Sequence, residues 1–127
     1  MEQKKKNLNE LIERYIKELK IPELEEFLQI YSSLQNFLAT TKGFSRKKFA
    51  CFVEERFQKR KYKGNEEYDE YAAVAKDALT GCFTKWGALE TISLHIQLIK
   101  QLEESKKQTI AIEKACKLYR DEIMKQN

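Results

Sequence analysis

Apolar residues recur at three- and four-residue steps through nearly the whole chain, which is the period of an amphipathic helix. The first helix is expected to start near Asn7 or Asn9, and Pro22 ends it. Proline is tolerated in a first helical turn, so Pro22 also begins the second helix. The apolar stripes of these two helices are Leu8, Leu11, Ile12, Tyr15, Ile16 and Leu19, followed by Leu24, Phe27, Leu28, Tyr31, Leu34 and Leu38.

The segment after the second stripe predicts a tight turn and a third helix. Gly43 suits the left-handed conformation that often ends a helix, and Ser45 can cap the N-terminus of the next one. The inner face of this third helix is expected to be Phe49, Phe52, Val53 and Phe57. Gly64 and Asn65 then close the third helix and cap a fourth.

The fourth helix carries a heptad-like seam, because its apolar residues step alternately by four and three. The seam consists of Tyr68, Ala72, Ala75, Leu79, Cys82, Trp86 and Leu89. Its central position predicts that Trp86 is buried. Gly81 and Gly87 interrupt the pattern, and we expect a break near Lys85–Ala88. The seam serves either as core within one chain or as the surface of a homodimer.

The last part of the chain contains no glycine or proline after Gly87 and leaves one question open. The polar run 103–108 separates two apolar stripes, Ile92, Ile96, Ile99 and Leu102 before it, and Ile112, Ala115, Cys116, Tyr119 and Ile123 after it. This run is either a turn or an exposed stretch of one long helix. A turn is favoured because globular helices usually span ~8–20 residues. The pattern as a whole predicts an all-α, single-domain bundle of five or six helices over residues 1–127.

Charge is distributed unevenly along this pattern. The net charge is only +4, but residues 42–63 hold nine basic side chains against Glu54 and Glu55. The rest of the chain holds 15 basic and 18 acidic residues, a net charge of −3. Local basicity of this kind is typical of a surface that binds a polyanion.

The basic segment also resembles the helix–turn–helix of DNA-binding proteins. The resemblance covers residues 35–55 and indicates a helix–turn–helix at 35–57, but no particular family. It rests on Gln35, Ala39, Gly43, Phe44 and Ser45, followed by Phe49 and Phe52. In such proteins the small residue lets two helices cross closely, and the glycine makes the turn. Lys42 departs from the pattern, because an apolar residue is usual there. The alternative is an ordinary helical hairpin.

Three cations in the first turn of the third helix distinguish these alternatives. The helix dipole disfavours Arg46, Lys47 and Lys48 at this end by ~0.3–1 kcal/mol each, so an external anion explains them better than stability does. A recognition helix contacts DNA mainly through its N-terminal residues. The expected nucleic-acid-binding residues are Ser45, Arg46, Lys47, Lys48, Arg56, Lys59, Arg60, Lys61 and Lys63. Duplex DNA is the expected partner, although the residues do not distinguish DNA from RNA.

Other chemistry finds little support in the sequence. Cys51, Cys82 and Cys116 form no CxxC pair and predict buried free thiols in a reducing compartment, with neither disulfide nor metal. His95, beside an apolar stripe, is expected at the core boundary. Neither a nucleophile–base pair nor a phosphate-binding glycine loop is present, so we expect no enzyme and no cofactor. No apolar run has the length of a signal peptide or a membrane span, which predicts a cytoplasmic protein.

The leading hypothesis is therefore a small helical nucleic-acid-binding protein, such as a DNA-binding regulator or an accessory factor of a mobile element. The alternative is a non-catalytic adaptor or subunit that binds a protein partner or assembles in a ribonucleoprotein. The two differ at the start of the third helix. A compact near-perpendicular helix pair with a free second N-terminus favours DNA, and a long antiparallel hairpin that covers this terminus favours the adaptor.

Overall fold

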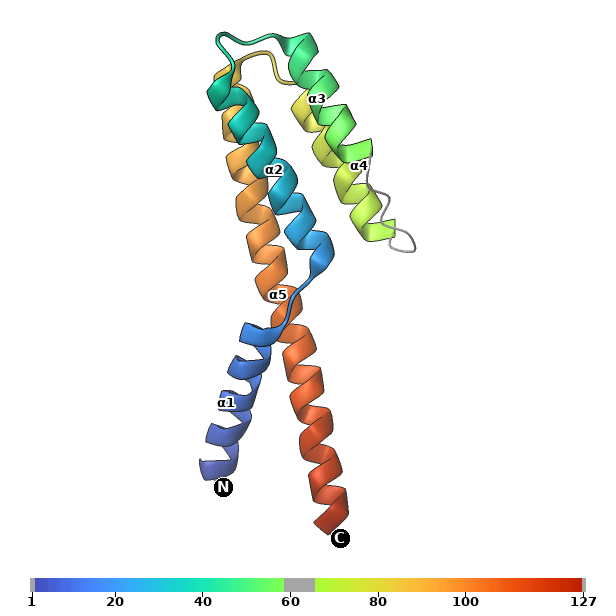
Figure 1. Cartoon of the computed structure of the whole chain (residues 1–127). Coiled ribbons are helices and arrows are strands. Elements are labelled where there is room, and N and C mark those ends of the chain that lie inside the picture. The colour runs from blue at the N-terminus through green and yellow to red at the C-terminus, as the bar shows by residue number, and fades with distance from the viewer. Residues whose placement is uncertain (1, 59–65, 127) are drawn as a thin grey trace. The chain divides into compact units, whose positions relative to one another are not determined.

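The structure describes residues 2–58 and 66–126, and within these residues the chain forms five helices and no strand. The structure is a computed structural model, and Figure 1 shows it. The helices are α1 (Glu2–Glu18), α2 (Pro22–Thr40), α3 (Arg46–Gln58), α4 (Glu66–Thr80) and α5 (Lys85–Gln126). The expected all-α class is confirmed. The predicted stop at Gly64 and cap at Asn65 lie outside the described residues.

The contacts of the chain gather in two compact units. Unit 2 spans residues 22–100 and contains α2, α3, α4 and the first part of α5. Unit 1 combines residues 1–21 with residues 101–127, that is, α1 with the rest of α5. In unit 2 successive helices run in alternating directions, so the α2–α3 turn and the α4–α5 turn lie at the same end (Figure 1).

Unit 2 holds an aromatic core to which all four of its helices contribute. The Phe27 ring of α2 lies 6.5 Å from Phe57 of α3 and 6.4 Å from Tyr68 of α4. Tyr31 and His95 of α5 form a T-shaped pair with ring centroids 5.7 Å apart. The buried residues of unit 2 are Leu24, Phe27, Ile30, Tyr31, Leu34, Leu38, Phe49, Val53, Phe57, Tyr68, Ala75, Leu79, Ala88, Ile92 and Ile99. The predicted inner faces of α2 and α3 are therefore largely confirmed, with Phe52 half-buried.

The break in the seam comes earlier than expected and changes the role of Trp86. Thr84 caps α5, since its Oγ1 accepts the Gly87 N–H at 2.9 Å and its carbonyl accepts the Ala88 N–H at 3.0 Å. The helical phase restarts at this cap, which turns Ala88 and Ile92 inward. Trp86 is 71% exposed, so its predicted burial is wrong.

Part of the seam contributes to the intrachain core. Tyr68, Ala75 and Leu79 are buried inside unit 2. Leu89 is half-buried. A homodimer through Tyr68–Leu89 stays a prediction, and the end of the seam near Trp86 is the part that remains open to it.

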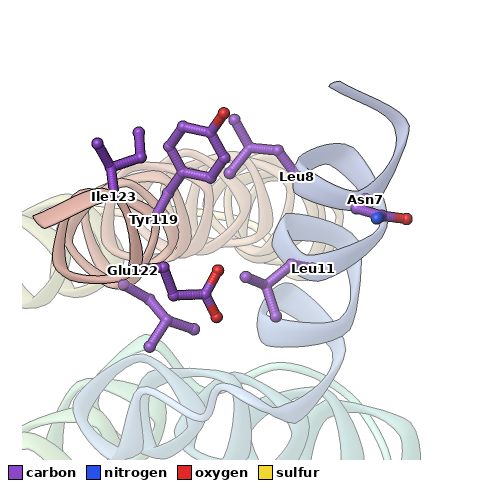
Figure 2. A pocket seen from close by; sticks show the side chains of 7 residues that line it. Asn7, Leu8, Leu11, Tyr119, Glu122 and Ile123 are labelled. Atoms are coloured by element: carbon purple, nitrogen blue, oxygen red, sulfur yellow. The ribbon is translucent and has the colours of Figure 1, made fainter. Parts of the chain in front are cut away.

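Unit 1 is a pair of helices with an open groove. Figure 2 shows four side chains that point toward the space between the two helices: Leu8 and Leu11 of α1, and Tyr119 and Glu122 of α5. This groove has a volume of about 440 Å³. The small residues Ala111 and Ala115 are fully buried, whereas the apolar stripe of α1 is only half-buried.

Helix α5 is one continuous helix of 42 residues, so the turn favoured at residues 103–108 is wrong. The alternative of one long helix holds because the run contains good helix formers and no glycine or proline. Glu103 and Lys107 add an ion pair of 3.6 Å across one helical turn. Helix α1 also begins earlier than expected, at Glu2. No helix in the described residues is long and apolar enough to cross a membrane.

Candidate nucleic-acid interface

The α2–α3 turn is built as its residues predict. Gly43 has a φ of 75°, a left-handed conformation that side chains other than glycine rarely adopt. Ser45 caps α3, because its Oγ accepts the Lys48 N–H at 3.3 Å. Phe44 is half-buried and packs 5.7 Å from the Phe49 ring, so it closes the junction.

Helices α2 and α3 form an antiparallel pair. Phe37, near the end of α2, stacks on Phe52 with ring centroids 4.4 Å apart. Tyr31, earlier in α2, meets Phe57, near the end of α3, at 6.2 Å. Contacts thus run in opposite directions along the two helices, whereas a near-perpendicular crossing would bring them together at one point. Ala39 is exposed, so α2 and α3 do not cross at the small residue of the resemblance. The helix–turn–helix itself stays a prediction.

The N-terminus of α3 is open to solvent. Ser45, Arg46, Lys47 and Lys48 are all exposed. The Arg46 guanidinium lies 3.9 Å from the centroid of the Phe83 ring, in cation–π contact. Within the described residues, neither Lys47 nor Lys48 has a carboxylate within ion-pair distance. Both lysines are therefore available to an anion at a helix end where the dipole disfavours them.

The downstream basic residues are not brought to this end of α3. Arg56 is exposed, and its guanidinium lies 4.9 Å from the centroid of the Phe52 ring. It lies ten residues after Arg46, which corresponds to about 15 Å along a helix. Glu54 and Glu55 lie between them in sequence and are exposed. Lys59, Arg60, Lys61 and Lys63 lie outside the described residues.

A second turn at the same end of unit 2 contributes residues that the sequence patterns did not single out as a site. Lys85 at the start of α5 donates a 3.5 Å hydrogen bond from Nζ to the Thr41 carbonyl at the end of α2. Phe83 reaches Arg46 from the same turn. The residue pattern could have indicated this, because Phe83 and Trp86 flank Lys85 in a segment, 80–89, that has no acidic residue.

The remaining candidates for chemistry are His95 and the free cysteines. His95 is half-buried against Tyr31, and its buried Nδ1 has no hydrogen-bond partner in the structure. Burial lowers the pKa of His95 because the charged imidazolium loses hydration. Cys51 and Cys116 are exposed free thiols, so the predicted burial of the cysteines is wrong for these two. No three His, Cys, Asp or Glu side chains gather as metal ligands in the described part of the chain.

Comparisons of the chain with protein-family models, curated proteins and solved structures give no match.

Proposed function

We propose that this protein binds nucleic acid, with the N-terminus of α3 against the phosphate backbone. The observation that carries the proposal is that Lys47 and Lys48 are exposed and have no ion-pair partner among the described residues. Cations at a helix N-terminus lower stability, so folding does not account for them. A phosphate ligand accounts for the two lysines, because the free N–H groups, the helix dipole and both ammonium groups all attract phosphate.

Arg46 has a second role that separates it from the two lysines. Its contact with Phe83 joins the α2–α3 turn to the α4–α5 turn. A cation–π contact at an exposed site stabilises by about 0.5–1 kcal/mol, so Arg46 contributes to structure as well as to positive charge. Lys47 and Lys48 are the cleaner probes of ligand binding.

The proposed ligand includes duplex DNA, read by α3 as a recognition helix in a regulator or a mobile-element accessory factor. The free N-terminus of α3 supports this role, because recognition helices contact base edges through their first residues. The extent of the basic surface bears on affinity. With Arg56 about three turns away, α3 offers one compact phosphate contact rather than a continuous track.

The alternative function is a non-catalytic adaptor or subunit that binds a protein or assembles in a ribonucleoprotein. The antiparallel pairing of α2 with α3 favours it, since DNA-binding helix–turn–helix pairs cross steeply. The exposed N-terminus of α3 does not favour the adaptor, because the expected adaptor hairpin would cover this terminus.

A binding titration at two salt concentrations tests the proposal. Labelled duplex DNA, single-stranded DNA and RNA are titrated with the full chain at roughly 50 and 200 mM salt. Neutralised phosphates release counterions, so affinity should fall steeply as salt rises. A flat salt response, or no binding at low salt to any of the three, would support the adaptor.

A further inference from the structure

We propose that the end of unit 2 formed by the α2–α3 and α4–α5 turns prefers single-stranded nucleic acid, whose bases stack on Phe83 and Trp86. The inference rests on the nucleic-acid binding proposed above and names the form of the ligand. Phosphates of the same strand lie against Lys47 and Lys48. Phe83 and Trp86 are separate stacking positions, three residues apart in sequence.

The first observation is the exposure of the two aromatic side chains. Phe83 is 74% exposed and Trp86 is 71% exposed, which makes them the most exposed large hydrophobic residues of the described chain. Neither packs into the core of unit 2, although that core is otherwise rich in aromatic rings. Flat aromatic surfaces open to solvent are the feature on which unpaired bases stack, with little dependence on sequence.

The second observation is that the aromatic and basic side chains belong to one surface. Arg46 of α3 lies over the Phe83 ring, and Lys85 holds the end of α2 through the Thr41 carbonyl. These two contacts join the turns at their shared end (Figure 1). The guanidinium lies over one face of the Phe83 ring, and the Phe83 side chain is 74% exposed, so we expect a base to stack on the opposite face.

The third observation is the sign of the charge in the two turns. Residues 41–48 and 80–89, which contain the two turns, carry five cations and no carboxylate: Lys42, Arg46, Lys47, Lys48 and Lys85. A partner that joins flat apolar rings to regularly spaced negative charge complements this surface. A nucleic-acid strand has that chemistry.

Single-stranded nucleic acid fits this surface better than a duplex does, because its bases are free to stack on the Phe83 and Trp86 rings. In a duplex the base faces are stacked within the helix, so Phe83 and Trp86 can reach them only by unstacking base pairs. In a single strand the faces are free, and each stacked base adds to the electrostatic contact. Glu90 lines the same surface pocket of α5 as Trp86, and its carboxylate repels phosphate, so the nucleic-acid backbone is expected to run on the α3 side.

The fluorescence of Trp86 tests the stacking directly, because it is the only tryptophan of the chain. The full chain is titrated with an unlabelled oligothymidine and with a duplex of equal length. Stacking of a base on the indole should quench the emission with the single strand more strongly than with the duplex.

The affinity is then measured by anisotropy of labelled oligonucleotides for Phe83→Leu, Trp86→Leu and a control, Val74→Ala. The control truncates an exposed apolar residue of α4.

The expected result is that Phe83→Leu and Trp86→Leu each weaken single-strand binding by about five- to 150-fold. Duplex binding and the control should change little. Salt-dependent binding that is equal for both ligands, with no quenching and no effect of either aromatic variant, would overturn the stacking inference. Nucleic-acid binding through the lysines would then still stand. Absence of binding to any oligonucleotide at low salt would overturn the proposed function and the stacking with it.

Discussion

The two units of this chain bury their apolar residues to very different degrees. Among the residues whose burial the structure describes, eighteen hydrophobic residues are buried; fifteen of them belong to unit 2, and the other three, in unit 1, are Ile21, Ala111 and Ala115. The apolar stripe of α1 is as regular in sequence as that of α2, yet every one of its members stays half-exposed. Periodicity thus predicts which side of a helix is apolar, while burial depends on how many other helices pack against that side.

Because unit 2 is better buried than unit 1, we expect unit 2 to contribute most of the stability and to hold the ligand-binding residues in place. Four helices in unit 2 enclose an aromatic core and hold its two turns in place, so exposed residues on these turns are positioned by a rigid scaffold. In unit 1 the buried residues of α5 are the small Ala111 and Ala115, and a groove lies between α1 and α5. Lys114 covers Tyr15 there by cation–π contact, 4.4 Å from the ring centroid.

The largest expected effect is the loss of a ring from the core of unit 2. Phe27→Ala removes a fully buried ring that contacts Phe57 and Tyr68, and it should lower the free energy of unfolding by about 3–5 kcal/mol. Urea unfolding followed by circular dichroism measures it. A loss below about 1 kcal/mol would show that the aromatic core does not hold unit 2 together.

A matched truncation in unit 1 should cost less. Leu11→Ala removes a half-buried side chain that lines the groove, so only part of its transfer free energy is lost, about 1 kcal/mol. The same urea experiment measures this loss. If Leu11→Ala were as damaging as Phe27→Ala, another surface would cover the groove in solution, and the contrast between the units would fail.

Acidification should weaken unit 2 through His95. Its pKa is lowered by burial, so the unfolded chain takes up a proton at higher pH than the folded chain. Stability is therefore expected to fall as the pH decreases through the ordinary histidine pKa of about 6.5. Thermal melts between about pH 7.5 and 5.5 measure the fall, and His95→Gln should flatten it because glutamine stays neutral. An equal slope in the variant would assign the pH dependence to other groups.

Replacement of Trp86 should have the smallest effect on stability. Because the side chain is 71% exposed, Trp86→Leu should change the free energy of unfolding by no more than about 0.5 kcal/mol. The melting temperature of the variant compared with that of the unaltered chain is the measurement. A large drop would mean that the indole packs against apolar surface in solution.

The sequence predicted most of this architecture, for reasons visible in particular residues. Pro22, Gly43 and Ser45 have conformational or capping preferences strong enough to place the two ends of α2 and the start of α3 within a few residues. The end of α4 was misplaced because either Gly81 or Gly87 could mark the break in the helix, and only the Thr84 cap of the folded structure decides between them. The length of α5 was missed because polar helix formers resemble a turn when no partner face is known.

The candidate site was predicted only in part. Charge and capping are local properties, so they identified the exposed N-terminus of α3 from the sequence alone. The pairing of Arg46 with Phe83 joins residues that are distant in sequence and depends on the bundle bringing two turns to one end. The phase of α5, set by the cap, is likewise what exposes Trp86.

The most direct test of nucleic-acid binding sets charge against stability at the start of α3. In the double variant Lys47→Glu/Lys48→Glu, acids replace cations at a helix N-terminus. The glutamate at residue 48 can also form a capping box with Ser45, so stability should hold or rise slightly. The matched control is Lys100→Glu/Lys117→Glu, which makes the same charge change at two exposed lysines of α5 instead of α3.

The measurement is a titration of labelled single-stranded and duplex oligonucleotides at low salt, with a thermal melt of each variant. We expect the α3 variant to stay folded and to lose binding, because two attractions become repulsions beside the phosphates. The control should retain most of its affinity. Equal loss of binding in both variants, or unchanged binding in the α3 variant, would contradict a phosphate site at Lys47 and Lys48.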